Sequence, residues 1–182
     1  KLPSGLDALA HHLQGRWKSR RQFQQECWEA AGRVEAAALA LADCRDEDLR
    51  KQLAACRVTV RRKGGRVLDE VEPMLALVSE IAKRTLKLRP YREQLMAAIG
   101  LLHGRLVEMA TGEGKTLAIA LAAAISGWSG RTVHVITAND YLAGRDAEQL
   151  AQFYEACRLR VSAVSAKMET QERREVYRAD IV

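Results

Sequence analysis

Aromatic residues make up only 5% of the chain, whereas alanine is abundant, and this balance favours helices. No stretch of about 18 consecutive apolar residues occurs, so no segment is expected to cross a bilayer. A secretory signal pattern is also absent. The four cysteines form no CxxC pair, and none stands near a histidine at zinc-ligand spacing. We therefore expect free thiols in a reducing cytosol rather than disulfides or a zinc site.

The composition is otherwise that of a soluble globular protein, with 48% hydrophobic and 29% charged residues, which argues against disorder. The net charge is +6, and the excess is densest from Arg57 through Arg61, Arg62 and Lys63 to Arg66, with no acid among them. This run indicates either an ordinary solvated helix end or a surface for anionic lipid or nucleic acid. Short basic runs are common on ordinary surfaces, so the first interpretation is favoured.

The chain divides into two parts that differ in their pattern of expected secondary structure. Residues 1–66 predict an N-terminal helical region that ends at the Lys-Gly-Gly sequence of residues 63–65. In residues 67–182, helical and strand-like segments alternate after Arg89 and Pro90. We expect helices over 115–126, 141–154 and 170–177, and strands over 105–109, 132–137, 159–164 and 180–182. This alternation predicts an α/β fold with right-handed crossovers and a parallel sheet, unfinished at its end.

The strongest chemical signal is the sequence Met-Ala-Thr-Gly-Glu-Gly-Lys-Thr over residues 109–116, between an expected strand and an expected helix. Gly112 and Gly114 allow a tight turn and close approach to phosphate oxygens, and the loop amides with the following helix form an anion site. Lys115 is expected to reach the β- and γ-phosphates of ATP, and the Thr116 hydroxyl to bind Mg²⁺. The residues of this predicted nucleotide loop are Thr111, Gly112, Glu113, Gly114, Lys115 and Thr116, of which Lys115 and Thr116 are the catalytic candidates.

Met109 narrows the class of ATPase that the loop indicates, and Glu113 bears on the choice of catalytic base. The broad motif has glycine where Met109 stands, and helicase-like ATPases tolerate other residues there. An incidental lysine beside a glycine turn is the alternative, but both glycines and the Lys-Thr pair stand at the required offsets. Glu113 lies inside the loop, so we do not expect it to be the base that orients water.

The chain from Leu88 onward resembles the SecA family. Thr-Gly-Glu-Gly-Lys-Thr at 111–116 and Asn-Asp-Tyr-Leu-Ala at 139–143 are specific in combination. The matching pieces are residues 89–95, 102–103, 108–117, 134–143, 145–148 and 172–181, with weaker similarity back to residue 45. The pattern departs from the family at Ala110, where arginine or lysine is usual, at Ala138, and over the first 40 or so residues.

This resemblance implies a cytosolic motor that spends ATP between two RecA-like domains to push preproteins through a membrane channel. The expected fold is therefore a partial RecA-like, helicase-type P-loop NTPase sheet with flanking helices, and residues 67–182 are its first part. The implied partners are a SecYEG-type channel and preproteins, at a cytoplasmic location peripheral to the inner membrane. Anionic lipid and a homodimer are left open. The implied cofactors are ATP and Mg²⁺, and an isolated N-terminal portion without the later acidic strand motif is not expected to hydrolyse ATP.

The resemblance also implies a base site. Gln94 takes the role of the adenine-reading glutamine, with Leu88, Arg89 and Tyr91 lining the base. For Gln94 alone, a surface helix residue would be the simpler interpretation. Asn139 and Asp140 follow a predicted strand, where ligand loops belong in open α/β sheets, but a helix cap is the favoured role.

Two other functional classes fit parts of the sequence. A DEAD-box-like nucleic-acid helicase shares the phosphate loop and the glutamine, but the sequence after residue 137 reads Ala-Asn-Asp-Tyr-Leu and lacks the Pro-Thr-Arg-Glu-Leu run of such helicases. Nucleic acid is therefore not the expected partner. Residues 1–66 would alternatively be a helical adaptor, with Trp17, Phe23 and Trp28 as an exposed partner surface; burial in the core is favoured.

Overall fold

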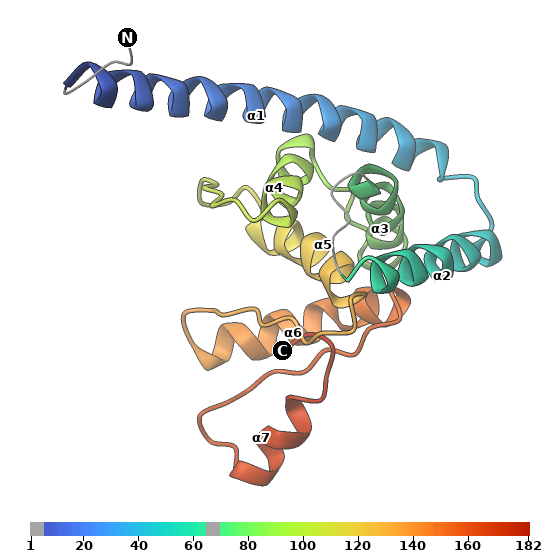
Figure 1. Cartoon of the computed structure of the whole chain (residues 1–182). Coiled ribbons are helices and arrows are strands. Elements are labelled where there is room, and N and C mark those ends of the chain that lie inside the picture. Colours follow the sequence, from blue (N-terminus) through green and yellow to red (C-terminus); the bar gives the residue numbers. More distant parts are fainter. Residues whose placement is uncertain (1–5, 65–69) are drawn as a thin grey trace.

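The computed structural model describes residues 6–64 and 70–182, with side chains from residue 21 onward. Seven helices occupy the described residues (Figure 1). They are α1 (Leu6–Ala40), α2 (Asp46–Arg62), α3 (Val71–Leu86), α4 (Arg92–Leu102), α5 (Lys115–Gly127), α6 (Asp140–Ala156) and α7 (Thr170–Val176). Figure 1 shows α1 along one side of the body, with α6 and α7 on the opposite side.

Helix α3 is the centre of the core. Its residues 74–82 are all buried, because α1, α5 and α6 pack around it and α2 and α4 also contact it. Helix α5 is almost as enclosed, and most of its buried positions are alanines. Small side chains let neighbouring helix backbones approach closely while still excluding water.

The helices begin and end where local chemistry favours it. Helix α2 has three acids in its first turn and Arg61 and Arg62 in its last turn, which complements the helix dipole at both ends. Helix α6 begins at Asn139, whose side-chain oxygen accepts a hydrogen bond from the Leu142 amide at 2.9 Å. The predicted capping role of Asn139 is confirmed. The helices predicted at 115–126, 141–154 and 170–177 are also confirmed, within one to two residues at each end.

The predicted parallel sheet is wrong. In the described residues, the segments expected as strands at 132–137, 159–164 and 180–182 meet only through isolated parallel bridges from Val133 and Val161 to Ile181. Backbone hydrogen bonds hold residues 180–182 between the other two segments, for example from Val135 N to Val182 O at 2.7 Å and from Ser162 N to Ile181 O at 3.0 Å. Single bridges do not continue into ladders, so no strand forms there.

The strand predicted at 105–109 is also wrong. Residues 105–110 have no regular secondary structure, and the side chain of Leu106 is fully exposed. A strand is stabilised by hydrogen bonds to a neighbour, and no backbone hydrogen bond joins residues 106–109 to another described segment. Residues 6–64 and 70–182 are therefore a helical assembly in which the extended segments cover one edge, and the α/β, RecA-like sheet expected from the sequence is not observed in them.

The N-terminal helices pack on the rest of the chain. Helix α1 contacts α3 and α4, and residues of α1 and α2 belong to the same hydrophobic cluster as α3 and α5. Phe23 is half-buried against that cluster, whereas Trp28 is 39% exposed, with the Arg92 guanidinium 4.2 Å from its ring centre. The side chain of Trp17 and the predicted boundary at residues 66–67 lie outside the described residues. No helix in the described part of the chain is both long and apolar enough to cross a membrane.

Candidate nucleotide-binding site

Residues 109–114 form an exposed turn that leads directly into α5. Gly112 has φ 91° and Gly114 has φ 73°, both in the left-handed region that favours glycine. A Cβ on Gly112 would meet open space, whereas a Cβ on Gly114 would collide with the side-chain amide of Gln94. Glycine is thus favoured at position 114 by its backbone angle, and a side chain there would also have to displace the Gln94 amide from its bond to Glu113.

The two charged side chains of the loop bond to the loop's own backbone. The Glu113 carboxylate accepts a hydrogen bond from the Ala110 amide at 2.7 Å. Lys115 Nζ donates to the carbonyl oxygens of Ala110 at 2.8 Å and Met109 at 3.2 Å. Both side chains are exposed, so the ammonium is free to exchange these carbonyls for an anion without moving the core.

This turn fits a phosphate chain. The first amides of an α-helix lack partners within the helix, and α5 is 13 residues long, so its start presents amide hydrogens and the positive end of a dipole. The left-handed glycine before it turns the backbone toward the same place, and Lys115 adds a full positive charge. Amides, dipole and ammonium together are what a polyphosphate requires.

Gln94 ties this turn to α4. The side chain is 5% exposed, and its amide nitrogen donates to the carbonyl oxygen of Glu113 at 2.9 Å. Its amide oxygen accepts from the Tyr91 backbone amide at 2.9 Å. Both ends of the amide are therefore engaged within the chain, so contact with a base would require at least one of these bonds to exchange. The adenine-reading role of Gln94 stays a prediction.

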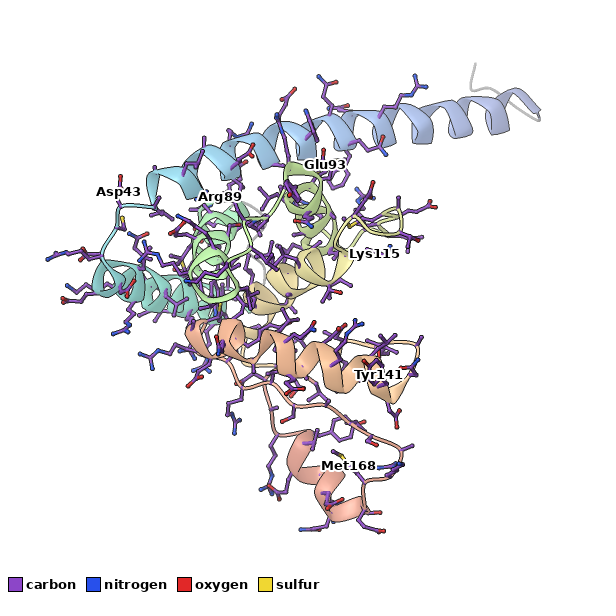
Figure 2. All side chains as sticks on the ribbon, turned by 180° about the vertical axis from the view of Figure 1, so that it is seen from behind. Asp43, Arg89, Glu93, Lys115, Tyr141 and Met168 are labelled. Atoms are coloured by element: carbon purple, nitrogen blue, oxygen red, sulfur yellow. The ribbon has the colours of Figure 1, made fainter. Side chains whose placement is uncertain are left out.

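The other residues predicted for the base site lie in the connection between α3 and α4 (Figure 2). Leu88 is 53% exposed, Tyr91 is 72% exposed, and the Arg89 side chain between them is 36% exposed. Exposed apolar surface beside a guanidinium suits a planar, electron-rich ring, which stacks on apolar faces and on arginine. Through Gln94, this connection is linked directly to the phosphate turn at the start of α5.

One charged residue near this site was missed by the sequence analysis. Glu80 lies in the middle of α3 with a side chain that is 1% exposed, and Arg84 Nε donates to its Oε1 at 2.9 Å. This hydrogen bond, ahead of a second one to Asp46, raises the pKa of Arg84 above its ordinary value. The signal in the sequence was a glutamate on an apolar helix face with arginine four residues later, the spacing of a helical ion pair.

The structure brings few metal ligands together. No group of three or more His, Cys, Asp and Glu residues in the described part of the chain is arranged to hold a metal ion. Thr116 is half-buried in the first turn of α5, beside Lys115. A magnesium ion at this turn would therefore depend on the Thr116 hydroxyl and on phosphate oxygens, which is how such ions are bound in nucleotide sites.

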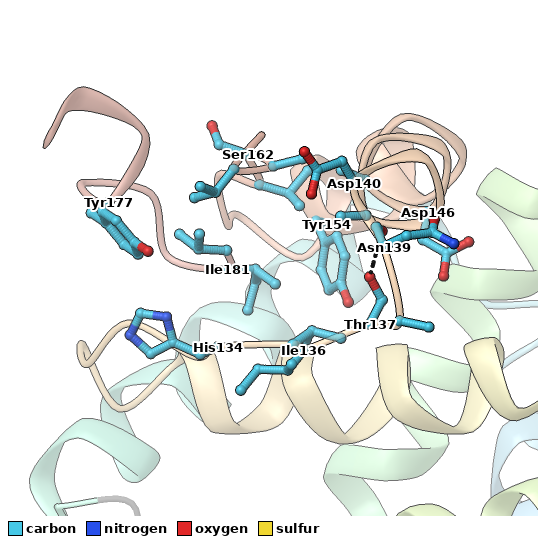
Figure 3. A pocket seen from close by; sticks show the side chains of 18 residues that line it. His134, Ile136, Thr137, Asn139, Asp140, Asp146, Tyr154, Ser162, Tyr177 and Ile181 are labelled. Carbon is cyan, nitrogen blue, oxygen red and sulfur yellow. Dashed lines mark hydrogen bonds between the residues drawn. The ribbon is translucent and has the colours of Figure 1, made fainter. Parts of the chain in front are cut away.

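A cavity of about 330 Å³ lies elsewhere, between the bridged segments and α6 (Figure 3). Figure 3 shows the His134–Thr137 segment on one side and Asp140 and Tyr154 of α6 on the other. Two polar residues of its lining have partners within the chain: Asp140 accepts from the Ala166 amide at 2.6 Å, and the His134 ring lies tilted against that of Tyr177 with centroids 5.8 Å apart. None of its lining residues belongs to the phosphate turn.

Comparison with known proteins identifies the family. A family model described as the SecA DEAD-like domain matches residues 12–182. The chain is 42% identical over its whole length to the protein translocase subunit SecA 2 of Magnetococcus marinus and 41% identical to that of Chlorobium chlorochromatii, and it spans 28% and 27% of their lengths. It is 47% identical to the SecA 2 subunit of Mycolicibacterium smegmatis over 77% of the chain and 17% of that protein. The chain therefore belongs to the SecA DEAD-like domain family.

Proposed function

We propose that this chain binds Mg²⁺ and ATP at the turn before α5, as part of a motor that drives proteins across a membrane. The observation that carries the proposal is the pair of left-handed glycines leading into Lys115 and Thr116 at the helix start. The relatives spanned in part by this chain are named protein translocase subunits, which supports the translocation role.

In this proposal each residue of the turn has a separate task. Lys115 leaves the carbonyls of Met109 and Ala110 and neutralises the β- and γ-phosphates. The amides of residues 111–116 hold the phosphate oxygens, and Gly112 and Gly114 keep the turn open for them. Thr116 contributes its hydroxyl to the magnesium ion, which spreads the charge that develops on the phosphates during transfer.

The base is proposed to pack against the connection between α3 and α4. Leu88 and Tyr91 supply exposed apolar surface, Arg89 supplies a planar cation, and Gln94 exchanges its bond to Glu113 or Tyr91 for an edge of adenine. An amide side chain is suited to this task because it both donates and accepts. A base that changes the hydrogen bonds of Gln94 would thereby also affect the phosphate turn, to which Gln94 is bonded.

Substitution of the turn lysine tests the proposal. We expect Lys115→Ala in the natural full-length chain to weaken ATP binding by about 10- to 100-fold, the loss typical of a charge-assisted hydrogen bond. Lys51→Ala is the matched control, because Lys51 is an exposed lysine that pairs with Glu47 on α2, away from the turn. The measurement is equilibrium titration with ATP and Mg²⁺. Equal affinity in the Lys115→Ala variant and the parent would refute the assignment of this turn.

The proposed partners are a SecYEG-type channel and unfolded preproteins, and the proposed location is the cytoplasmic face of the inner membrane. Contact with anionic lipid through the basic end of α2 is a further part of the proposal, because Arg61 and Arg62 are exposed there. The test is ATP turnover by the natural chain with channel-containing membranes and a secretory preprotein. Stimulation by both together is expected, and turnover that responds to neither would exclude the translocation role.

A further inference from the structure

A buried carboxylate oxygen without a hydrogen-bond partner lies near Arg89 of the proposed base site. Glu80 Oε2 is buried and has no hydrogen-bond partner, alone among the buried side-chain nitrogen and oxygen atoms of the described residues. Buried carboxylate oxygens are nearly always bonded, because they lose their water without replacement. This oxygen can therefore accept one further hydrogen bond.

The other oxygen of Glu80 binds Arg84, which in turn contacts the corner between α1 and α2, residues 41–46. Oε1 accepts from Arg84 Nε at 2.9 Å, and Arg84 Nη1 pairs with Asp46 at the start of α2. Arg84 Nη2 donates to three backbone oxygens where α1 ends, those of Leu41 at 3.2 Å, Ala42 at 3.1 Å and Cys44 at 2.8 Å. Movement of the Glu80 carboxylate would therefore alter the contacts of Arg84 with residues 41–46.

Arg89 faces the unsatisfied oxygen. Its Nη2 atom is 3.9 Å from Glu80 Oε2, within range of an ion pair but too far for a hydrogen bond. Helix α3 ends at Leu86, and the φ of 60° at Lys87 turns the chain out of the helix, so Arg89 stands on the connection to α4 and not on a helix. Lys83 is the other cation near Glu80, but its Nζ lies 3.9 Å from Oε1, the oxygen that Arg84 already holds.

We propose that Glu80 is a positioning residue that couples the base site to the corner between α1 and α2. When a nucleotide base packs against residues 88–91, Arg89 closes onto Glu80 Oε2 and is held across the base. The Glu80 carboxylate then rotates relative to Arg84, and this rotation changes the hydrogen bonds and the ion pair that Arg84 makes with residues 41–46. The inference rests on the proposed function, because it needs a base at this site.

Two measurements on the natural full-length chain test the coupling. The first compares the affinity for ATP with the affinity for inorganic tripolyphosphate, which has the phosphates but no base. The second follows hydrogen exchange of residues 41–46 with and without ATP. The variants are Glu80→Gln, which keeps the shape and removes the charge, and Arg89→Gln. Glu72→Gln is the matched control, because Glu72 lies on the same helix and pairs with Arg33 of α1 at 2.6 Å, away from Arg89.

We expect Glu80→Gln and Arg89→Gln each to weaken ATP binding about fivefold, to leave tripolyphosphate binding unchanged, and to add nothing to each other when combined. ATP should alter exchange of residues 41–46 in the parent and in Glu72→Gln but not in either test variant. Glu80→Asp should restore part of the coupling, which a purely structural role would not predict. If Glu80→Gln does not fold, the hydrogen exchange of residues 41–46 in Arg89→Gln decides, because the loss of a base contact alone would weaken ATP binding without changing that exchange; the Arg89 side chain is partly exposed.

The outcomes separate this inference from the proposed function. Equal losses for ATP and tripolyphosphate, or additive effects of the two variants, would overturn the coupling while leaving the phosphate turn in place. Unchanged exchange of residues 41–46 on ATP binding to the parent would overturn it as well. Failure of Lys115→Ala to weaken ATP binding would instead reject the phosphate turn itself.

Discussion

At the scale of single residues, the phosphate turn depends most on Gly114. Its left-handed backbone would strain an alanine by about 1–2 kcal/mol, and the Gln94 amide lies where the added Cβ would stand. The loop of Gly114→Ala should relax to another shape, which ATP binding would have to reverse. We therefore expect about tenfold weaker ATP binding.

Gly104→Ala is the control for Gly114→Ala. Gly104 has φ 66° and open space around it, so it shares the backbone strain without the collision. Titration with ATP should show the control binding as the parent does. Equal affinity in both variants would mean that the contact between Gly114 and Gln94 does not shape the turn.

Residue-level chemistry was predictable where it is local. The glycines, Lys115 and Thr116 stand within eight consecutive residues, so their spacing alone predicted a glycine turn before a helix, which the structure has; its binding of phosphate stays a prediction. The role of Asn139 as a cap was likewise predicted from local sequence and is confirmed. Glu80 was not found, because the partners that give it meaning, Arg89 and the corner that Arg84 holds, are assembled only when three helices pack together.

At the scale of elements, the tie between α1 and α3 is sensitive to acid. Hydrogen bonding to Arg33 lowers the pKa of Glu72, so the carboxylate is stabilised in the folded chain relative to the unfolded chain. This contribution is present above the ordinary pKa of glutamate and is lost as the pH falls through the lowered value.

We expect Glu72→Gln to lower the midpoint of thermal unfolding by about 1 to 3 °C at neutral pH, as for a partly exposed ion pair. The difference from the parent should shrink as the pH falls below the ordinary pKa of glutamate and vanish once it is below the lowered pKa of Glu72, where the parent carboxylate is protonated too. Thermal unfolding followed by circular dichroism at several pH values measures this. A difference between Glu72→Gln and the parent that persists unchanged in acid would contradict the role of the charge.

Helices were predictable and strands were not, for the same reason. Leu77, Val78 and Ile81 recur at helical spacing within a single element, and all three are buried in α3. A strand exists only beside a partner, and the partner of Val133 is Ile181, 48 positions later in the chain. Alternating apolar residues at 132–137 indicated extended backbone correctly, but they carried no information on whether a ladder would form around it.

At the scale of the whole molecule, the sequence divided the chain into residues 1–66 and 67–182, and this division stays a prediction. The packing argues for joint stability of the two parts. Ala31 and Val34 of α1 are fully buried in the same cluster as Leu75 and Val78 of α3. Arg92 of α4 also donates to the Trp28 carbonyl oxygen of α1, at 2.9 Å from Nη2.

Native-state hydrogen exchange would decide between one cooperative body and two. If α1 and α3 share a core, amides of residues 27–38 and of residues 74–82 should open together, with the same free energy and the same dependence on denaturant in the natural full-length chain. Exposing one face of that core removes contacts of both helices, so the opening of either helix destabilises the other. Faster exchange of α1 with a shallow denaturant dependence would instead make the N-terminal helices a separate unit, and the coupling from Glu80 to residues 41–46 would then end at a mobile boundary.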